Sequence, residues 1–258
     1  MSLRLTFCSE NDPQLMKCAT YAIEAEVEAT HWWFTERRRL FGHLITGMGL
    51  PGGARVLDIG TSTGTNLRML RDLGFSRYEG LDTSEEAVHW CADKGYGKVT
   101  QGDVCALPFP DDTFDLVLAT DIIEHVDDDE VALREIRRVL KPRGRVLITV
   151  PAFMLLWGLQ DEVGQHKRRY RARELLDRAQ AAGMRVDRKF YFNYILFLPI
   201  LLARTIIRWT GAKVENENQL NSRFVNRLLQ LVFRFDVWSA PALHLPFGVS
   251  YLVVAGKS

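Results

Sequence analysis

Cysteine is scarce in this 258-residue chain, and neither sign of charge dominates it. The four cysteines stand far apart and form no Cys-x-x-Cys pair: Cys8, Cys18, Cys91 and Cys105. This spacing supports neither a zinc site nor a disulfide framework, and it suits a reducing compartment such as the cytosol. Thirty-three basic and thirty-two acidic residues leave a formal net charge of +1, so no overall field favours nucleic acid as a partner.

Long hydrophobic runs are missing as well. The longest near-apolar stretch, residues 190–203, spans 14 residues and is interrupted by Asn193 and Pro199. About 20 apolar residues are needed to cross a bilayer, and the first twelve residues turn acidic before a signal peptide could form. We therefore expect a soluble, cytoplasmic protein that can still contact a membrane at its periphery.

The middle of the chain alternates short β-branched runs with helical patterns. Strands are expected at 55–59, 77–81, 98–101, 116–120 and 145–150, with helices at 64–73, 84–94 and 128–140. The pattern continues with a helix at 172–182 and strands at 184–191 and 249–255. Strand–helix–strand units of this spacing build a parallel sheet with helices on both faces. We predict an α/β fold with a mainly parallel seven-stranded sheet.

Two regions flank or interrupt this pattern. Residues 1–50 are predicted to form a helical cap, and a Pro-Gly-Gly sequence at 51–53 opens the main domain, 51–258. Residues 192–248 form a 57-residue insertion that carries no strand signal. Its apolar residues recur at helical spacing at Leu220, Phe224, Leu228, Leu231, Val232 and Phe235, and Arg223, Arg227, Gln230 and Arg234 fall largely on the opposite face. Such a basic amphipathic helix is either a lid packed on its own domain or a helix lying on an anionic membrane.

The most informative segment follows the first predicted strand. A turn of Gly, Thr and Ser at residues 60–65 leads into a helical pattern. Glycines permit positive φ and close approach of a ligand, and the free N–H groups of a helix start face the same point. Asp82 ends the second strand, 24 residues after Asp58, where a carboxylate can accept hydrogen bonds from both hydroxyls of a ribose. Asp103 and Val104 follow the third strand and suit the amino group and the ring of an adenine.

The pyrophosphate fingerprint of dinucleotide-binding proteins, Gly-x-Gly-x-x-Gly, is absent. Its positions are occupied by Gly60, Ser62 and Thr65, so two of the three glycines are missing. A nucleoside without a pyrophosphate fits this turn better. A nucleotide-dependent oxidoreductase or epimerase remains an alternative, which the absence of a Tyr-x-x-x-Lys pair disfavours.

Five motifs follow one another between residues 54 and 151: D-x-G-x-x-x-G, G-L-D, G-D-V, F-D-L-V-L-A-T-D-I-I-E-H-V and L-K-P-R-G-R-V-L-I-T-V-P. In this order and spacing they resemble the class I S-adenosylmethionine-dependent methyltransferases, type 11-like, which implies a Rossmann-like fold and S-adenosylmethionine as cofactor. By this resemblance, the turn lines the methionine end of the cofactor, Asp82 holds the ribose and Asp103 the adenine. The complete expected cofactor-binding set is Asp58, Gly60, Thr61, Ser62, Gly64, Asp82, Thr83, Asp103, Val104 and Thr120. Ser62 replaces the family's usual glycine. Either a negative φ at this position tolerates the seryl side chain, or that side chain contacts the methionyl group.

Three flanking motifs, HWWF at 31–34, GQHKRRY at 164–170 and LPFG at 245–248, resemble a subgroup of these enzymes. Its members are often associated with glycan, glycolipid or cell-envelope pathways, which by analogy implies a small-molecule, glycan or lipid-linked acceptor. Residues 31–34 have two interpretations. They are either the aromatic face of a helix packed on the sheet or a lid over the cofactor cleft.

His166 and His125 are the candidate general bases, and by resemblance Asp121 lies beside the reacting centre. Methyl transfer is an in-line displacement for which positioning supplies most of the rate, and a base helps when the acceptor is a hydroxyl. His166 precedes a cationic cluster that favours a neutral imidazole: Lys167, Arg168, Arg169, Arg171 and Arg173. That cluster is either a solvated helix start or a recognition site for an anionic acceptor. No metal site is predicted.

We therefore predict methyl transfer from S-adenosylmethionine to a small-molecule, glycan or lipid-linked acceptor, with oxygen as the methylated atom. A non-catalytic cofactor-binding protein of the same fold is a further alternative, favoured only by Ser62. Nucleic acid is not an expected partner, because residues 120–123 replace the Asn/Asp-Pro-Pro-aromatic element of amino-methylating DNA enzymes. The sequence predicts neither the acceptor's identity nor the oligomeric state.

Overall fold

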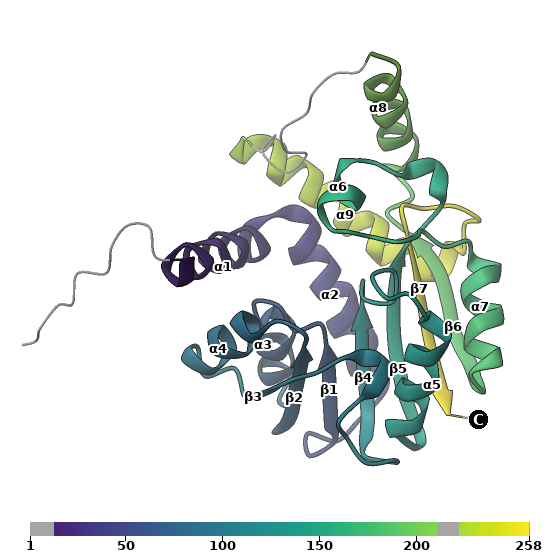
Figure 1. Cartoon of the computed structure of the whole chain (residues 1–258). Helices are drawn as coiled ribbons and strands as arrows, with labels where there is room; N and C mark the ends of the chain where they lie inside the picture. The colour runs from purple at the N-terminus through teal and green to yellow at the C-terminus, as the bar shows by residue number, and fades with distance from the viewer. Residues whose placement is uncertain (1–12, 211–221, 258) are drawn as a thin grey trace, which may run out of the picture.

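The computed structural model describes residues 13–210 and 222–257 (Figure 1). Cys8 and Leu220, which two of the sequence predictions include, lie outside these ranges. The backbone of Cys18 lies within them, but its side chain is not described. At the centre is one seven-stranded sheet with the order β3-β2-β1-β4-β5-β7-β6. Its strands are β1 (Arg55–Ile59), β2 (Arg77–Asp82), β3 (Lys98–Gln101), β4 (Phe114–Thr120), β5 (Leu140–Pro151), β6 (Met184–Phe192) and β7 (Ser250–Lys257). The predicted α/β fold and the positions of its strands are confirmed.

The direction of the strands explains where a ligand can bind. β1 to β5 pair in parallel, whereas β7 runs antiparallel to both β5 and β6. The chain builds outward from β1 through β2 to β3, then returns to place β4 on the other side of β1. The crevice beyond the carboxyl ends of β1 and β4 is therefore the switch point at which open α/β sheets bind ligands.

Helices cover both faces of the sheet. On one face pack α5 (Asp129–Val139) and α7 (Ala172–Ala181), and on the other α2 (Trp32–Gly47), α3 (Thr65–Asp72) and α9 (Arg223–Leu243). Each face of the sheet has its own hydrophobic core, and alternate residues of each strand point into one core or the other. Leu57 and Val117 lie in the core with α5 and α7, while Val56 and Leu116 lie in the core with α2 and α3. α4 (Glu85–Asp93) packs beside β2 and β3.

The N-terminal helices belong to the body of the domain. α2 buries Leu40, Phe41, Leu44 and Ile45, whose i, i+1, i+4, i+5 spacing places them on one face against the sheet. α1 (Pro13–Thr30) lies over the amino ends of α3 and α4 (Figure 1). Its Glu28 accepts hydrogen bonds from the hydroxyls of Thr63 and Thr65 in the turn after β1. α1 thereby covers the predicted glycine turn.

Short elements lead from β5 to the second half of the chain. They are the 3₁₀ turn η2 (Met154–Leu156) and α6 (Leu159–Val163), while another 3₁₀ turn, η1 (Val104–Ala106), follows β3. The predicted insertion contains two helices, α8 (Phe197–Thr210) and α9. Among the described residues, no helix combines the length and the hydropathy that crossing a membrane requires.

Candidate active site

A cleft of about 680 Å³ lies at the switch point and gathers most of the predicted site. Its lining includes Gly60, Thr61, Ser62, Asp82, Thr83, Asp103, Val104, Thr120, Asp121, His125 and His166. Residues 31–34 also line it. Two predicted cofactor residues, Asp58 and Gly64, are buried beneath the turn instead of facing the cleft. Residues that are spread over more than a hundred positions of sequence therefore meet in one cavity.

The turn after β1 needs glycine at Gly60 and Gly64. Both have positive φ, 72° and 79°, and a Cβ on Gly60 would stand 1.8 Å from Cδ1 of Ile122. Ser62 also has a positive φ, 47°, so the first of the two conditions considered for a seryl residue here, a negative φ, is not met. The turn has the left-handed conformation that glycine adopts without strain, and a seryl residue there costs about 1–2 kcal/mol.

Asp58 is fully buried in β1, at the base of the turn. Asn66 donates to its Oδ1 at 3.0 Å and to the Thr120 hydroxyl at 3.2 Å, but Oδ2 of Asp58 has no hydrogen-bond partner. Burial raises the pKa of Asp58 to about 7, partly offset by the bond from Asn66. An unpartnered buried carboxylate oxygen costs free energy unless a ligand donor or cation reaches it.

Asp82 and Asp103 are held in place by backbone donors. The Ser62 and Ser84 amides donate to the two carboxylate oxygens of Asp82, at 2.8 and 2.9 Å. The Cys105 amide donates to Oδ1 of Asp103 at 2.8 Å. These bonds orient both carboxylates at the ends of β2 and β3 and leave lone pairs free for a nucleoside.

These features fit the predicted cofactor. The two oriented carboxylates, Asp82 and Asp103, line the cleft and provide acceptors for a ribose and an adenine. In the turn after β1, the backbone can approach a ligand closely because no side chain projects from Gly60. The structure therefore supports the predicted residues as a site for S-adenosylmethionine.

The aromatic segment at residues 31–34 combines both of its predicted interpretations. Trp33 stacks on Phe192 and Phe233, with ring centroids 5.9 and 5.0 Å apart, which fixes α2 on β6 and α9. The same segment borders the cleft.

One turn later, Arg37 forms an ion pair with Asp121, and Thr149 donates to the same carboxylate at 3.1 Å. Arg37 was not predicted, although the three arginines after the aromatic segment were visible in the sequence.

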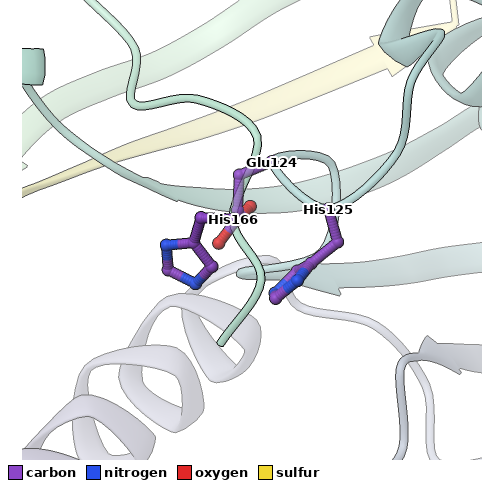
Figure 2. A group of neighbouring side chains, drawn as sticks. All are labelled: Glu124, His125 and His166. Carbon is purple, nitrogen blue, oxygen red and sulfur yellow. The ribbon is translucent and has the colours of Figure 1, made fainter. Parts of the chain in front are cut away.

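Glu124, His125 and His166 lie side by side at one end of the cleft, with Glu124 between the two rings (Figure 2). The ring centroids of the two histidines are 4.7 Å apart, edge to face. Glu124 is fully buried, neither carboxylate oxygen has a partner, and burial raises its pKa well above the ordinary value. Burial and the neighbouring His166 lower the pKa of His125. We call this group the acceptor-end cluster, because we expect the acceptor to bind beside it.

A carboxylate that sequence reasoning missed, Asp161, orients His166. Asp161 is fully buried in α6 and accepts from Nδ1 of His166 at 2.8 Å, from Nε of Arg169 at 2.7 Å and from the Gly158 amide at 2.8 Å. Arg204 of α8 pairs with its second oxygen at 3.5 Å. Although burial alone would raise the pKa of Asp161, the bonds from His166 and Arg169 lower it to about 2. With a proton on Nδ1, His166 has its Nε2 lone pair free to accept another.

The rest of the cationic cluster does not form an open anion site. Lys167 pairs with Asp127, and Arg168 pairs with Asp129 at 3.1 Å. Further along, Arg173 and Asp177 form an ion pair within α7. Of the predicted cluster, Arg169 alone borders the cleft. Lys167, Arg168 and Arg173 therefore fit the interpretation of a solvated helix start better than that of a site for an anionic acceptor.

Known proteins resemble the chain most closely around the glycine turn. A family model described as a methyltransferase domain matches residues 57–148. An uncharacterised methyltransferase of Bacillus subtilis, YcgJ, is 38% identical over 36% of this chain and 39% of its own length. The ubiquinone/menaquinone biosynthesis C-methyltransferase UbiE of Hahella chejuensis is 37% identical over 39% of this chain and 44% of its own. This chain thus spans less than half the length of either relative.

One relative matches over a longer stretch. The malonyl-[acyl-carrier protein] O-methyltransferase of Erwinia pyrifoliae is 29% identical over 86% of this chain and 85% of its own length. Among solved structures, a chain from the Haloferax volcanii Trm112 methyltransferase activator complex superposes with a TM-score of 0.62, at 22% identity over 95% and 97% of the two chains. The [4+2]-cyclase SpnF gives 0.60, at 22% identity over 95% of each. Residues 57–148 therefore form a methyltransferase domain, and the chain has the Rossmann-like fold of the class I methyltransferases.

Proposed function

We propose that this protein transfers the methyl group of S-adenosylmethionine to a hydroxyl oxygen of a small-molecule, glycan or lipid-linked acceptor. The observation that carries the proposal is the shared cleft: His166, with Nδ1 held by Asp161, lies in the same cavity as the glycine turn, Asp82 and Asp103. An oriented imidazole at the far end of a cofactor cleft is the arrangement that deprotonating an acceptor hydroxyl requires.

The chain's own residues provide binding, orientation and a proton acceptor. The turn after β1, Asp82 and Asp103 would hold the cofactor, which when bound supplies an activated methyl group on a sulfonium. His166 would accept the proton of the acceptor hydroxyl at Nε2, which would leave the oxygen free to take up the methyl group that the cofactor supplies. Asp161 stabilises the imidazolium that results, since it already accepts the Nδ1 proton. Residues 31–34 and α1 exclude water over the cleft.

We propose oxygen as the methylated atom because His166 can act as a base, and the names of the relatives show that this choice needs a test. Their names include both a ubiquinone/menaquinone biosynthesis C-methyltransferase and a malonyl-[acyl-carrier protein] O-methyltransferase. Three arginines also border the cleft, and each forms an ion pair: Arg37 with Asp121, and Arg169 and Arg204 with Asp161.

The test uses S-adenosylmethionine labelled in its methyl group, incubated separately with a total lipid extract and with a soluble metabolite fraction. Labelled product is then heated with hydriodic acid, which releases methyl groups from oxygen but not from carbon. His166→Ala should lower the rate of labelling about 10²-fold without changing cofactor affinity. The matched control is His89→Ala, on the exposed face of α4 outside the cleft, which should keep the wild-type rate.

Full labelling by His166→Ala would contradict the role of this base, and label retained after hydriodic acid would contradict O-methylation. The oxidoreductase alternative makes a different prediction, binding of NAD in place of S-adenosylmethionine. The [4+2]-cyclase among the structural neighbours shows that the fold alone does not fix the chemistry. Transfer of label is therefore the observation that decides for a methyltransferase reaction.

A further inference from the structure

The outer face of α8 is a stripe of large apolar side chains that the described residues leave uncovered. Leu198, Leu202, Ile206 and Trp209 are all exposed, and Trp209 is 89% exposed. Their spacing of four, four and three residues places them on one side of the helix. The opposite side carries Ile200 and Arg204, which border the cleft. One helix thus separates the acceptor end of the site from an unpaired hydrophobic face.

A second stripe of exposed apolar side chains lies on α9. Its exposed members, at i, i+4, i+7, i+11 and i+14, are Phe224, Leu228, Leu231, Phe235 and Trp238. The helix instead packs inward through Phe233, Val237 and Ala240. Gln230 and Arg234 also face inward and bond to the buried Glu36 of α2 at 3.0 Å, so Arg234 does not belong to a free basic face.

Together these helices expose far more apolar surface than isolated residues do. Scattered hydrophobic side chains are normal on protein surfaces, but ordered stripes of them mark an interaction site. Figure 1 shows α8 and the amino-terminal half of α9 projecting from the side of the molecule at which β1 and β4 end. We call the nine exposed side chains of the two stripes the apolar docking face.

Charge indicates what covers this face. α8 contains no acidic residue, and the single carboxylate of α9, Asp236, is buried against the backbone amides of Asn193 and Ile195. The exposed charged side chains on the two helices include Arg208, Arg223 and Arg227, all cationic. Trp209 and Trp238 add the amphipathic rings that favour a membrane–water interface. We propose that the apolar docking face binds an anionic lipid bilayer, with α8 and α9 lying in its interface.

A second copy of the chain fits the same face less well. A two-fold interface places identical patches against each other, which here would bring cationic helices together without an acidic partner on either one. A bilayer rich in anionic lipid accepts both the apolar stripe and the arginines. Docking would also place the cleft, bordered by the inner side of α8, next to the lipid surface. Delivery of a lipid-linked acceptor rests on the proposed function, whereas docking does not.

The experiment is co-sedimentation of the full chain with vesicles of phosphatidylcholine and phosphatidylserine in equal amounts, and with phosphatidylcholine alone. We expect binding to the anionic vesicles at low salt and weaker binding at high salt. The variant Leu202→Ser/Trp209→Ser/Trp238→Ser should weaken binding at least about tenfold. Its control, Ile23→Ser/Leu73→Ser, removes exposed apolar side chains from α1 and from the end of α3.

A charge pair of variants tests the second half of the argument. Arg223→Glu/Arg227→Glu should weaken binding to anionic vesicles at least about tenfold, whereas Arg173→Glu/Arg185→Glu, at exposed positions elsewhere, should not. Wild-type protein that stays in the supernatant at low salt would overturn the proposal. A dimer in light scattering whose dissociation follows the apolar substitutions, without vesicle binding, would assign the face to a second copy. Binding of S-adenosylmethionine by the same variants, measured by calorimetry, separates a failure of docking from a failure of the proposed function.

Discussion

Replacing Asp161 by asparagine should destabilise the protein strongly, because this carboxylate neutralises the interior of the acceptor end. Its side chain is fully buried and bonded to His166, Arg169 and the Gly158 amide, with Arg204 beside it. Removing one partner of a buried ion pair costs about 3–5 kcal/mol, since the other charge stays buried. For a protein of this size that corresponds to a fall in melting temperature of roughly 6–20 °C.

The matched control is Asp127→Asn. Asp127 forms an ion pair with Lys167, the residue after His166, but the Asp127 side chain is 91% exposed. Exposed ion pairs contribute only about 0–1 kcal/mol to the free energy of unfolding. Both variants remove one charge of the same sign, and both are measured by thermal unfolding and by denaturant titration at neutral pH. If Asp161→Asn unfolds no earlier than Asp127→Asn, the buried network does not have the role that we assign to it.

The same carboxylate predicts a pH dependence. The pKa of Asp161 falls from 3.8 in the unfolded chain to about 2 in the folded protein, which corresponds to about 2.5 kcal/mol. A lowered pKa means that this stability is present above pH 4 and is lost as the pH falls toward 2. The difference between wild type and Asp161→Asn should therefore shrink between pH 5 and pH 3. A constant difference over that range would refute the assignment.

Three other changes test the cofactor side of the cleft. Asp82→Ala should weaken binding of S-adenosylhomocysteine about 10- to 100-fold in calorimetry, since a charged acceptor contributes about 1.5–3 kcal/mol; unchanged affinity would mean that the ribose lies elsewhere. Gly60→Ala should abolish that binding, because its Cβ would overlap Ile122, whereas Gly47→Ala has free space and should bind normally. Asp58→Asn should remove a loss of stability that wild type shows as the pH rises from 4 toward 7, because burial raises the pKa of Asp58 to about 7; parallel pH–stability curves would exclude this.

The sequence predicts this fold well because its strands are short apolar runs separated by strong turn signals. All seven predicted strands are present, and β1 and β3 have the predicted bounds. The least accurate boundary is the start of β5, five residues before the predicted one. Lys141, Pro142 and Gly144 indicate a loop, yet Leu140 pairs with Phe114 across a register shift that accommodates them. Tertiary pairing overrides local propensity there.

The site was predictable only where one short motif carries the chemistry. The turn after β1, Asp82, Asp103 and His166 fall into recognisable motifs, and the structure brings them to one cleft. Asp161 and Arg204 carry no local signal, because each acquires its role from contacts between segments that are tens of residues apart. The sequence likewise leaves the orientation of α9 open. Helical periodicity identifies an apolar face, but the contacts of Phe233 and of the buried Glu36 decide which side of the helix faces inward.

The most direct test of the central claim is calorimetric titration of the wild-type chain with S-adenosylmethionine and, separately, with NAD. The cleft has oriented carboxylates for a nucleoside, and its turn lacks the glycines that a pyrophosphate needs. We therefore predict saturable binding of S-adenosylmethionine at one site per chain and no binding of NAD. Saturable binding of NAD, or no binding of S-adenosylmethionine by folded protein, would contradict the account.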